Sequence, residues 1–190
     1  MRWPSAFAPL LHLPATRWLQ IGAAAVLWGR AWQHLWHDAP FRSLLWNEPI
    51  MAPLIGRLGL DWQWWVGSAA VDEGIQTAIR LTGVLYLLAG LVAVFAERPM
   101  AKKGRWLLGL ATCMLVLLAW MYWLEHWRHL AQFLEYTLQV AFPLLLWRAM
   151  SGTGALKWTP GMSRALRIAV ALTFAAHGLY ALGVYPVPGT

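Results

Sequence analysis

The chain has 190 residues, of which 59% are hydrophobic and 12% are charged, and its formal net charge is +7. Soluble globular domains carry roughly 25% charged residues, and disordered chains are polar and poor in aromatic residues, so the composition excludes both classes. Fifteen tryptophans exceed what a soluble core needs, and tryptophan concentrates at membrane–water interfaces. The composition therefore predicts an integral membrane protein of one domain.

Five apolar segments that are long enough to cross a membrane follow one another along the chain. A hydrocarbon core about 30 Å thick needs about 20 mostly apolar residues of helix. Residues 38–73 form a Trp-rich loop that prolines divide, and we expect short interfacial helices in this outer loop. The expected fold is an all-α integral membrane protein, a bundle of about five transmembrane helices within one domain, 1–190. The predicted spans are residues 18–37, 74–96, 106–124, 130–148 and 166–184.

The charges of the connecting segments predict the orientation. Segments 1–17, 97–105 and 148–167 carry net charges of +2, +3 and +4, whereas segments 38–73 and 125–135 carry −3 and −1. Basic loops remain in the cytoplasm. We therefore expect a multi-pass protein of the inner (cytoplasmic) membrane with its N-terminus in the cytoplasm and its C-terminus on the periplasmic side. The positive charge is explained by topology, so the expected partner is the lipid bilayer and no nucleic acid is expected.

Polar residues inside the predicted spans recur at helical spacing. With the predicted orientation, all of them lie in the outer half of the membrane. Charged side chains at this depth cost about 2.5–3.5 kcal/mol each, so they must pair or line a cavity. The pattern predicts a polar pocket in the outer leaflet. The four stripes are Arg30, Gln33, His34 and His37; Asp72, Gln76 and Arg80; Gln132, Glu135 and Gln139; and Thr173, His177 and Tyr180.

The first hypothesis for the pocket is a quinone or a similar lipophile with a polar head. Arg30 and Arg80 would contact its oxygens, and His34, His177 or Glu135 would carry protons. In the alternative, the two arginines pair with Glu135, Asp72 or Glu73 and only lock helices together. The predicted cofactor-binding residues are Arg30, His34, Arg80, Glu135, His177 and Tyr180.

The histidines suggest a second kind of ligand. His34 with His37, and His126 with His129, form His-x-x-His pairs whose imidazoles share one helix face and could bind one metal ion. A b-type haem would instead need two histidines on facing helices, such as His34 and His177. The alternative is that these histidines anchor helix ends at the interface.

Three segments resemble a known family. The sequences IGAAAVLWGRAWQHLW (21–36), DAPFRSLLWNE (38–48) and HGLYALGVYPVPG (177–189) are similar to proteins of the DoxX-like family. This resemblance covers about a quarter of the chain. It implies a small bundle of several transmembrane helices. It also implies a role in quinone-linked redox chemistry, because some members are membrane subunits of a thiosulfate:quinone oxidoreductase. The family usually has four spans, and it supplies no motif that assigns a catalytic residue here.

The sequence therefore leaves three functional hypotheses. The first is a redox-associated membrane protein with a quinone in its outer pocket. The second is a non-catalytic subunit that packs against, or helps to assemble, a larger membrane complex, with the Trp-rich loop as its docking face. The third is a membrane protein that binds a metal ion or haem through its histidines.

Overall fold

The computed structural model describes residues 13–125, 130–152 and 155–185. Of the described residues, 80% are helical and none lies in a strand, which confirms the all-α prediction. The helices are α2 (Ala15–Trp36), α3 (Phe41–Leu45), α4 (Glu48–Arg57), α5 (Trp62–Gly67), α6 (Ala69–Val94), α7 (Pro99–Lys103), α8 (Trp106–Glu125), α9 (Leu130–Leu134), α10 (Thr137–Ala149) and α11 (Pro160–Ala181).

Two helices are long and apolar enough to cross a membrane. They are α6 with 26 residues and α8 with 20 residues, and at 1.5 Å per residue they reach about 39 Å and about 30 Å. The helices α2 and α11 have 22 residues each, but neither contains a stretch as apolar as those of α6 and α8. The structure thus supports a helical membrane protein with two candidate spans, and a bundle of five spans remains a proposal.

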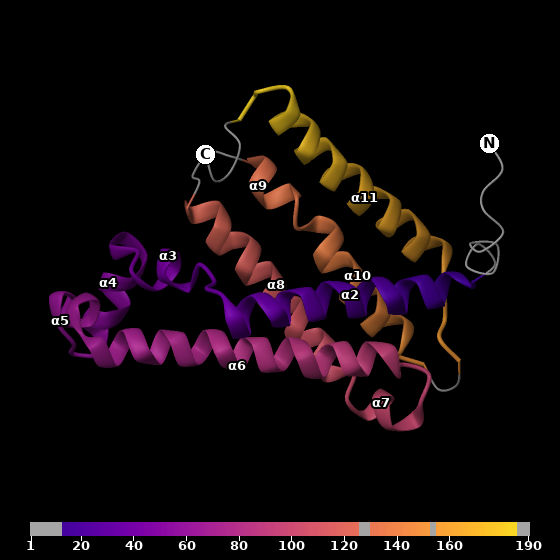
Figure 1. The fold of residues 1–190 in the computed structure, drawn as a ribbon, viewed down its shortest axis with the longest axis horizontal. Helices are drawn as coiled ribbons and strands as arrows, with labels where there is room; N and C mark the ends of the chain where they lie inside the picture. The colour runs from indigo at the N-terminus through magenta and orange to yellow at the C-terminus, as the bar shows by residue number, and fades with distance from the viewer. Residues whose placement is uncertain (1–12, 126–129, 153–154, 186–190) are drawn as a thin grey trace.

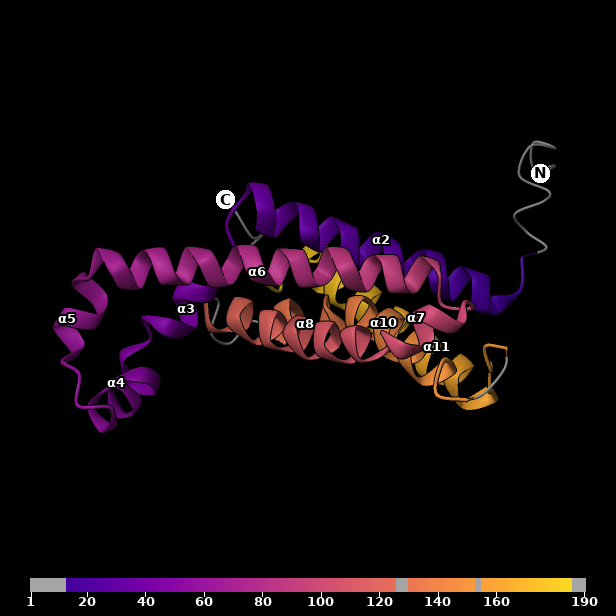
Figure 2. The same ribbon diagram turned by 90° about the horizontal axis from the view of Figure 1, so that it is seen from below.

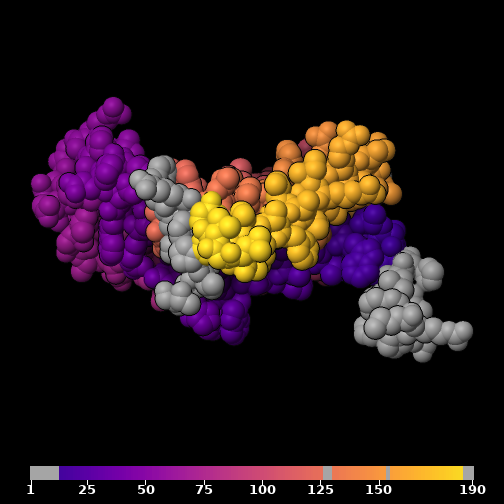
Figure 3. All heavy atoms as spheres, turned by 90° about the horizontal axis from the view of Figure 1, so that it is seen from above, coloured from indigo at the N-terminus to yellow at the C-terminus, as the bar shows by residue number. Residues whose placement is uncertain are grey.

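The long helices pack side by side. Helix α2 lies antiparallel to α6 and packs most extensively against it, and α10 bridges α2, α8 and α11 (Figures 1 and 2). Helix α11 lies across one face of the molecule (Figure 3). The segment of α3, α4 and α5 forms the end opposite α7 (Figure 1).

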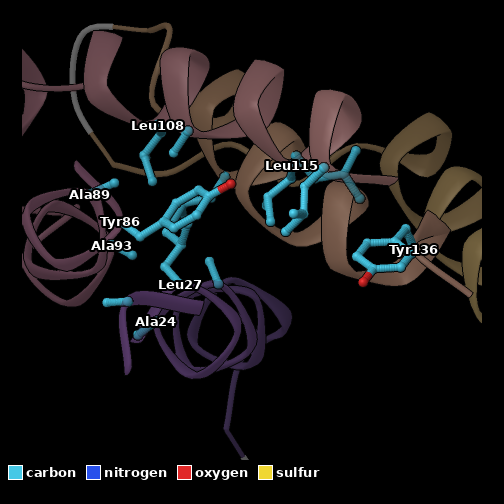
Figure 4. Close-up of a cluster of buried hydrophobic side chains, with 14 of the residues drawn as sticks. Ala24, Leu27, Tyr86, Ala89, Ala93, Leu108, Leu115 and Tyr136 are labelled. Atoms are coloured by element: carbon cyan, nitrogen blue, oxygen red, sulfur yellow. The ribbon is translucent and has the colours of Figure 1, made fainter. Parts of the chain in front are cut away.

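The interface between α2 and α6 is built from small residues. Alanines and glycines let two helix backbones approach closely, which is the usual packing of helices in membranes. The Tyr86 side chain of α6 fills the space between α6, α2 and α8, with Leu27 and Leu108 beside it (Figure 4). The small buried residues of the interface are Ala23, Ala24 and Ala31 of α2 and Gly83, Ala89, Gly90 and Ala93 of α6.

The predicted fourth span, 130–148, consists of two helices rather than one. Helix α9 ends at Leu134, and α10 begins at Thr137. The Thr137 hydroxyl lies 2.7 Å from the Leu134 carbonyl oxygen and 3.1 Å from that of Ala169 in α11. A threonine hydroxyl that bonds to nearby backbone carbonyls competes with the helical ladder. Residues 135 and 136 therefore form a turn that brings α10 against α11.

The loop 38–73 contains three short helices, α3, α4 and α5, before α6 begins at Ala69. Arg42 of α3 anchors the loop through two ion pairs, one with Asp72 of α6 at 2.6 Å and one with Asp38 at 3.1 Å. The indole nitrogen of Trp65 donates to the Leu45 carbonyl at 2.9 Å. The short helices were predicted, and these contacts hold them at one end of the bundle.

Candidate functional site

Arg30 is the centre of a polar cluster that joins α2 to α10. Its Nε and Nη2 atoms donate to Oε1 of Gln139 at 2.9 and 2.7 Å. Its Nη1 atom donates to Oε1 of Gln33 at 2.5 Å. The guanidinium carbon lies 4.7 Å from the ring centroid of Tyr136, which is within the range of a cation–π contact. Two amide oxygens and one aromatic ring therefore surround the cation.

A chain of hydrogen bonds extends the cluster from Arg30 to α8. Because arginine only donates, the oxygen of Gln33 must face Arg30 and its amide nitrogen must face away. That nitrogen donates to the hydroxyl oxygen of Tyr122 at 2.7 Å. The Tyr122 hydroxyl proton is then free to donate, and no described residue accepts it. Each bond in the chain Arg30–Gln33–Tyr122 points away from the cation, and successive bonds polarise one another.

Tyr122 lies in the wall of a polar pocket of about 340 Å³, where α2 ends and α8 ends. Arg42 also lines this pocket, together with the carboxyl groups of Asp38 and Glu125 and the small residues Ala39 and Pro40. The Tyr122 ring stacks on Tyr136, with 5.5 Å between the ring centroids and 27° between the planes. The Tyr122 phenol can donate to an oxygen atom of a ligand in this pocket, whereas the nitrogen atoms of Arg42 already donate to Asp38 and Asp72.

The charge of Arg30 has no carboxylate partner within the described part of the chain. The carboxylates that could have balanced it are used elsewhere, since Asp72 pairs with Arg42 and Glu135 lies 3.9 Å from His177. The interpretation of Arg30 as half of a buried ion pair is therefore wrong for the described residues. Its half-buried positive charge favours electron-rich oxygen atoms nearby.

Arg80, the second predicted arginine, does not join the cluster. It is exposed on α6, and it forms no hydrogen bond or ion pair with another described residue. Asp72, Gln76 and Arg80 are four residues apart, and each such step turns about 40° around a helix with 3.6 residues per turn. Arg80 therefore lies about 80° from Asp72 and outside the helix interface.

His34 is packed inside the protein and does not line the pocket. It is 1% exposed, its Nδ1 atom lies 2.8 Å from the Arg30 carbonyl oxygen, and its Nε2 atom has no partner. Its ring meets the ring of Tyr86 edge to face at 5.1 Å between centroids. The Tyr86 hydroxyl is also buried without a partner. His34 thus belongs to the interface of α2 with α6.

Glu135, His177 and Tyr180 take part in two separate polar contacts of α11, one with α9 and one with the turn between α9 and α10. The Tyr180 hydroxyl donates to Oε1 of Gln132 at 2.9 Å. The Nε2 atom of His177 is 3.9 Å from Glu135, and the His177 side chain is 63% exposed. These residues hold α11 in place, and they do not line the pocket beside Tyr122.

The predicted metal ligands are only partly within the described chain. His34 is buried, whereas His37, three residues later, is exposed. No group of three or more histidine, cysteine, aspartate or glutamate side chains suited to a metal ion occurs in the described residues. His126 and His129 lie outside these residues. The haem hypothesis placed His34 and His177 opposite one another, but the structure places them in two different contacts.

A second cavity, of about 580 Å³, lies on another face of α8. Its lining includes Cys113, Trp120, Trp123 and Phe133, and no charged side chain among the described residues contributes to it. It includes no residue of the Arg30 cluster. An apolar cavity of this kind suits a lipid chain better than a polar head group.

Tyr122 and Tyr136 are the site residues that the sequence prediction missed. Both lie in aromatic-rich segments, where tyrosine is not distinguished from interfacial anchors. Gln33 and Gln139 were recognised as parts of polar stripes, but they were not assigned to the site. A useful signal would have been that Gln139 and Tyr136 are three residues apart and share one face of a helix.

Comparisons of the chain with protein-family models, with curated proteins and with solved structures give no significant match. The chemistry of the site therefore rests on its own residues.

Proposed function

We propose that this protein binds a quinone, or a similar lipophile with an oxygen-bearing head, in the polar pocket beside Tyr122. The observation that carries the proposal is the donor chain from Arg30 through Gln33 to Tyr122, whose hydroxyl proton has no acceptor among the described residues. A quinone carbonyl is an acceptor without a proton of its own, so it suits this position. Arg42 also lines this pocket, but its nitrogen atoms already donate to Asp38 and Asp72, so it adds positive charge there rather than an unused donor.

The proposal revises the set of residues that contact the ligand. Arg30 acts through Gln33 and Tyr122, because each of its three nitrogen atoms already donates to Gln139 or Gln33 and it does not line the pocket. Arg80 has no part in the site. The resemblance to DoxX-like proteins, some of which work with quinones, is consistent with this choice of ligand and remains part of the proposal.

The binding proposal is tested by removing one hydroxyl group. Tyr122→Phe keeps the ring that stacks on Tyr136 and deletes the donor. We expect the dissociation constant for a radiolabelled short-chain quinone, measured by equilibrium dialysis in detergent, to rise about tenfold, because a buried hydrogen bond contributes about 1.4 kcal/mol.

Tyr180→Phe is the matched control, because it deletes a hydroxyl that bonds to Gln132 outside the pocket. We expect it to leave quinone binding unchanged. Equal affinity of Tyr122→Phe and the unmodified protein would refute the donor role, and equal losses in both variants would indicate a structural effect.

We further propose that five spans cross the inner membrane, with the loop of α3, α4 and α5 outside. The support is the alternation of charge between connecting segments. In a Cys113→Ala background, Glu48→Cys and Ser151→Cys place single thiols at exposed positions on either side of the bundle. In sealed right-side-out vesicles, we expect an impermeant maleimide to label the first directly and the second only after permeabilisation. Labelling of both from one side would contradict the topology.

A further inference from the structure

A groove of about 450 Å³ lies along α2 at the end of the molecule near α7. Ile21, Ala24, Ala25 and Trp28 of α2 line it, with Val94 from the end of α6. These side chains are apolar, and Ala25 is exposed in the floor of the groove. An apolar groove on a membrane helix offers a fixed path to a hydrocarbon chain.

The groove has a charged mouth. A second cavity of about 470 Å³ adjoins it, shares Arg17 and Val94 with it, and is lined also by Glu97 and Arg98. Arg17 pairs with Glu97 at 2.8 Å, whereas Arg98 is exposed and forms no ion pair with another described residue. The mouth therefore has an excess of one positive charge.

Gln20 adds an unused donor between the apolar groove and its charged mouth. Gln20 lines the groove, is 3% exposed, and accepts a hydrogen bond from Arg17 at 3.1 Å through Oε1. Its amide nitrogen is buried and has no hydrogen-bond partner among the residues that the structure describes. Buried polar groups in native proteins usually find a partner, so this nitrogen indicates a missing acceptor at the point where the groove becomes polar.

We infer that this groove and its mouth bind one anionic phospholipid. An acyl chain lies along Ile21, Ala25 and Trp28, the ester region faces Gln20, and the phosphate lies between Arg17 and Arg98. The charge excess distinguishes this occupant from a zwitterionic lipid, since a lysine or arginine near a membrane surface attracts anionic lipids. The site is separate from the polar pocket beside Tyr122 and does not depend on the quinone proposal.

The experiment measures lipid retention by native mass spectrometry of the full-length protein. The probes are phosphatidylglycerol and phosphatidylcholine with identical acyl chains. We expect the unmodified protein to retain more phosphatidylglycerol than phosphatidylcholine. Arg98→Gln should lower the ratio of the two retained lipids about fivefold, which corresponds to the effect of one basic residue. Arg57→Gln, which removes an exposed arginine of α4 at the opposite end, should leave the preference unchanged.

A second pair of variants tests the apolar half. Ala25→Leu fills the groove without altering a charge, and Ala175→Leu makes the same change at an exposed position of α11. We expect only Ala25→Leu to reduce retention of phosphatidylglycerol. Equal retention of both lipids by the unmodified protein would overturn the inference. It would also be overturned if Arg98→Gln reduced retention while Ala25→Leu did not, because the mouth would then hold the head group without an acyl chain in the groove.

Discussion

Replacement of Arg30 by methionine is expected to weaken quinone binding about fivefold to tenfold, the equivalent of about 1 kcal/mol. The cation no longer polarises Gln33 and Tyr122, and Gln33 is free to turn its amide group. The unfolding free energy should change by only about 1 kcal/mol, because two effects oppose one another. The Gln139 and Gln33 oxygens lose a donor, but the cost of keeping a charge within the bundle also disappears.

Both quantities can be measured on one sample. Binding is followed by equilibrium dialysis with a short-chain quinone, and stability by SDS titration in mixed micelles with circular dichroism as the readout. Arg80→Met is the matched control, since Arg80 is exposed and outside the cluster. Unchanged affinity in Arg30→Met would refute the role of the donor chain. A loss of several kcal/mol in stability would show instead that Arg30 mainly locks α2 to α10.

Gly83→Leu is expected to lower the unfolding free energy by about 3 kcal/mol, because it overpacks the interface of α2 with α6. A Cβ atom at this position would lie 2.9 Å from Cγ of Leu35 and 3.0 Å from Cβ of His34. The His34 Cβ atom is bonded directly to the backbone of α2, so it cannot move unless the helix moves.

Gly74→Leu is the matched control in the same helix. A Cβ atom at Gly74 meets nothing within 4 Å, and leucine is a better helix former than glycine. This variant should gain roughly 0.5 kcal/mol. SDS titration of both variants measures the difference, and equal stabilities would contradict close packing between α2 and α6.

The first polar stripe was predicted well because its spacing keeps it on one face. Residues 33, 34 and 37 lie three, four and seven positions after residue 30, and these spacings hold the four side chains within about 60° of a common direction on a helix. The structure uses this face, since Arg30 and Gln33 reach Gln139 and Tyr122. His34 lies at the edge of the same face, and its side chain packs in the interface of α2 with α6 rather than in the polar cluster.

The stripe of Asp72, Gln76 and Arg80 does not bring Arg80 to the polar cluster, because its residues are separated only by steps of four. Such a stripe winds around its helix, and Arg80 emerges from the interface. The close approach of Gly83 and Gly90 to α2 sets the rotation of α6. No local pattern in residues 72–80 contains that information.

Composition and segment length by themselves predicted a helical chain with helices long and apolar enough to cross a membrane, because in lipid an apolar segment of about 20 residues satisfies its backbone polar groups as a helix. Local spacing also placed Arg30 and Gln33 on one face. Only the tertiary structure decided that Tyr122 completes the donor chain, that Arg80 stays outside, and that α9 and α10 are separate helices. These features depend on how each helix is rotated against its neighbours, and contacts between residues far apart in sequence set that rotation.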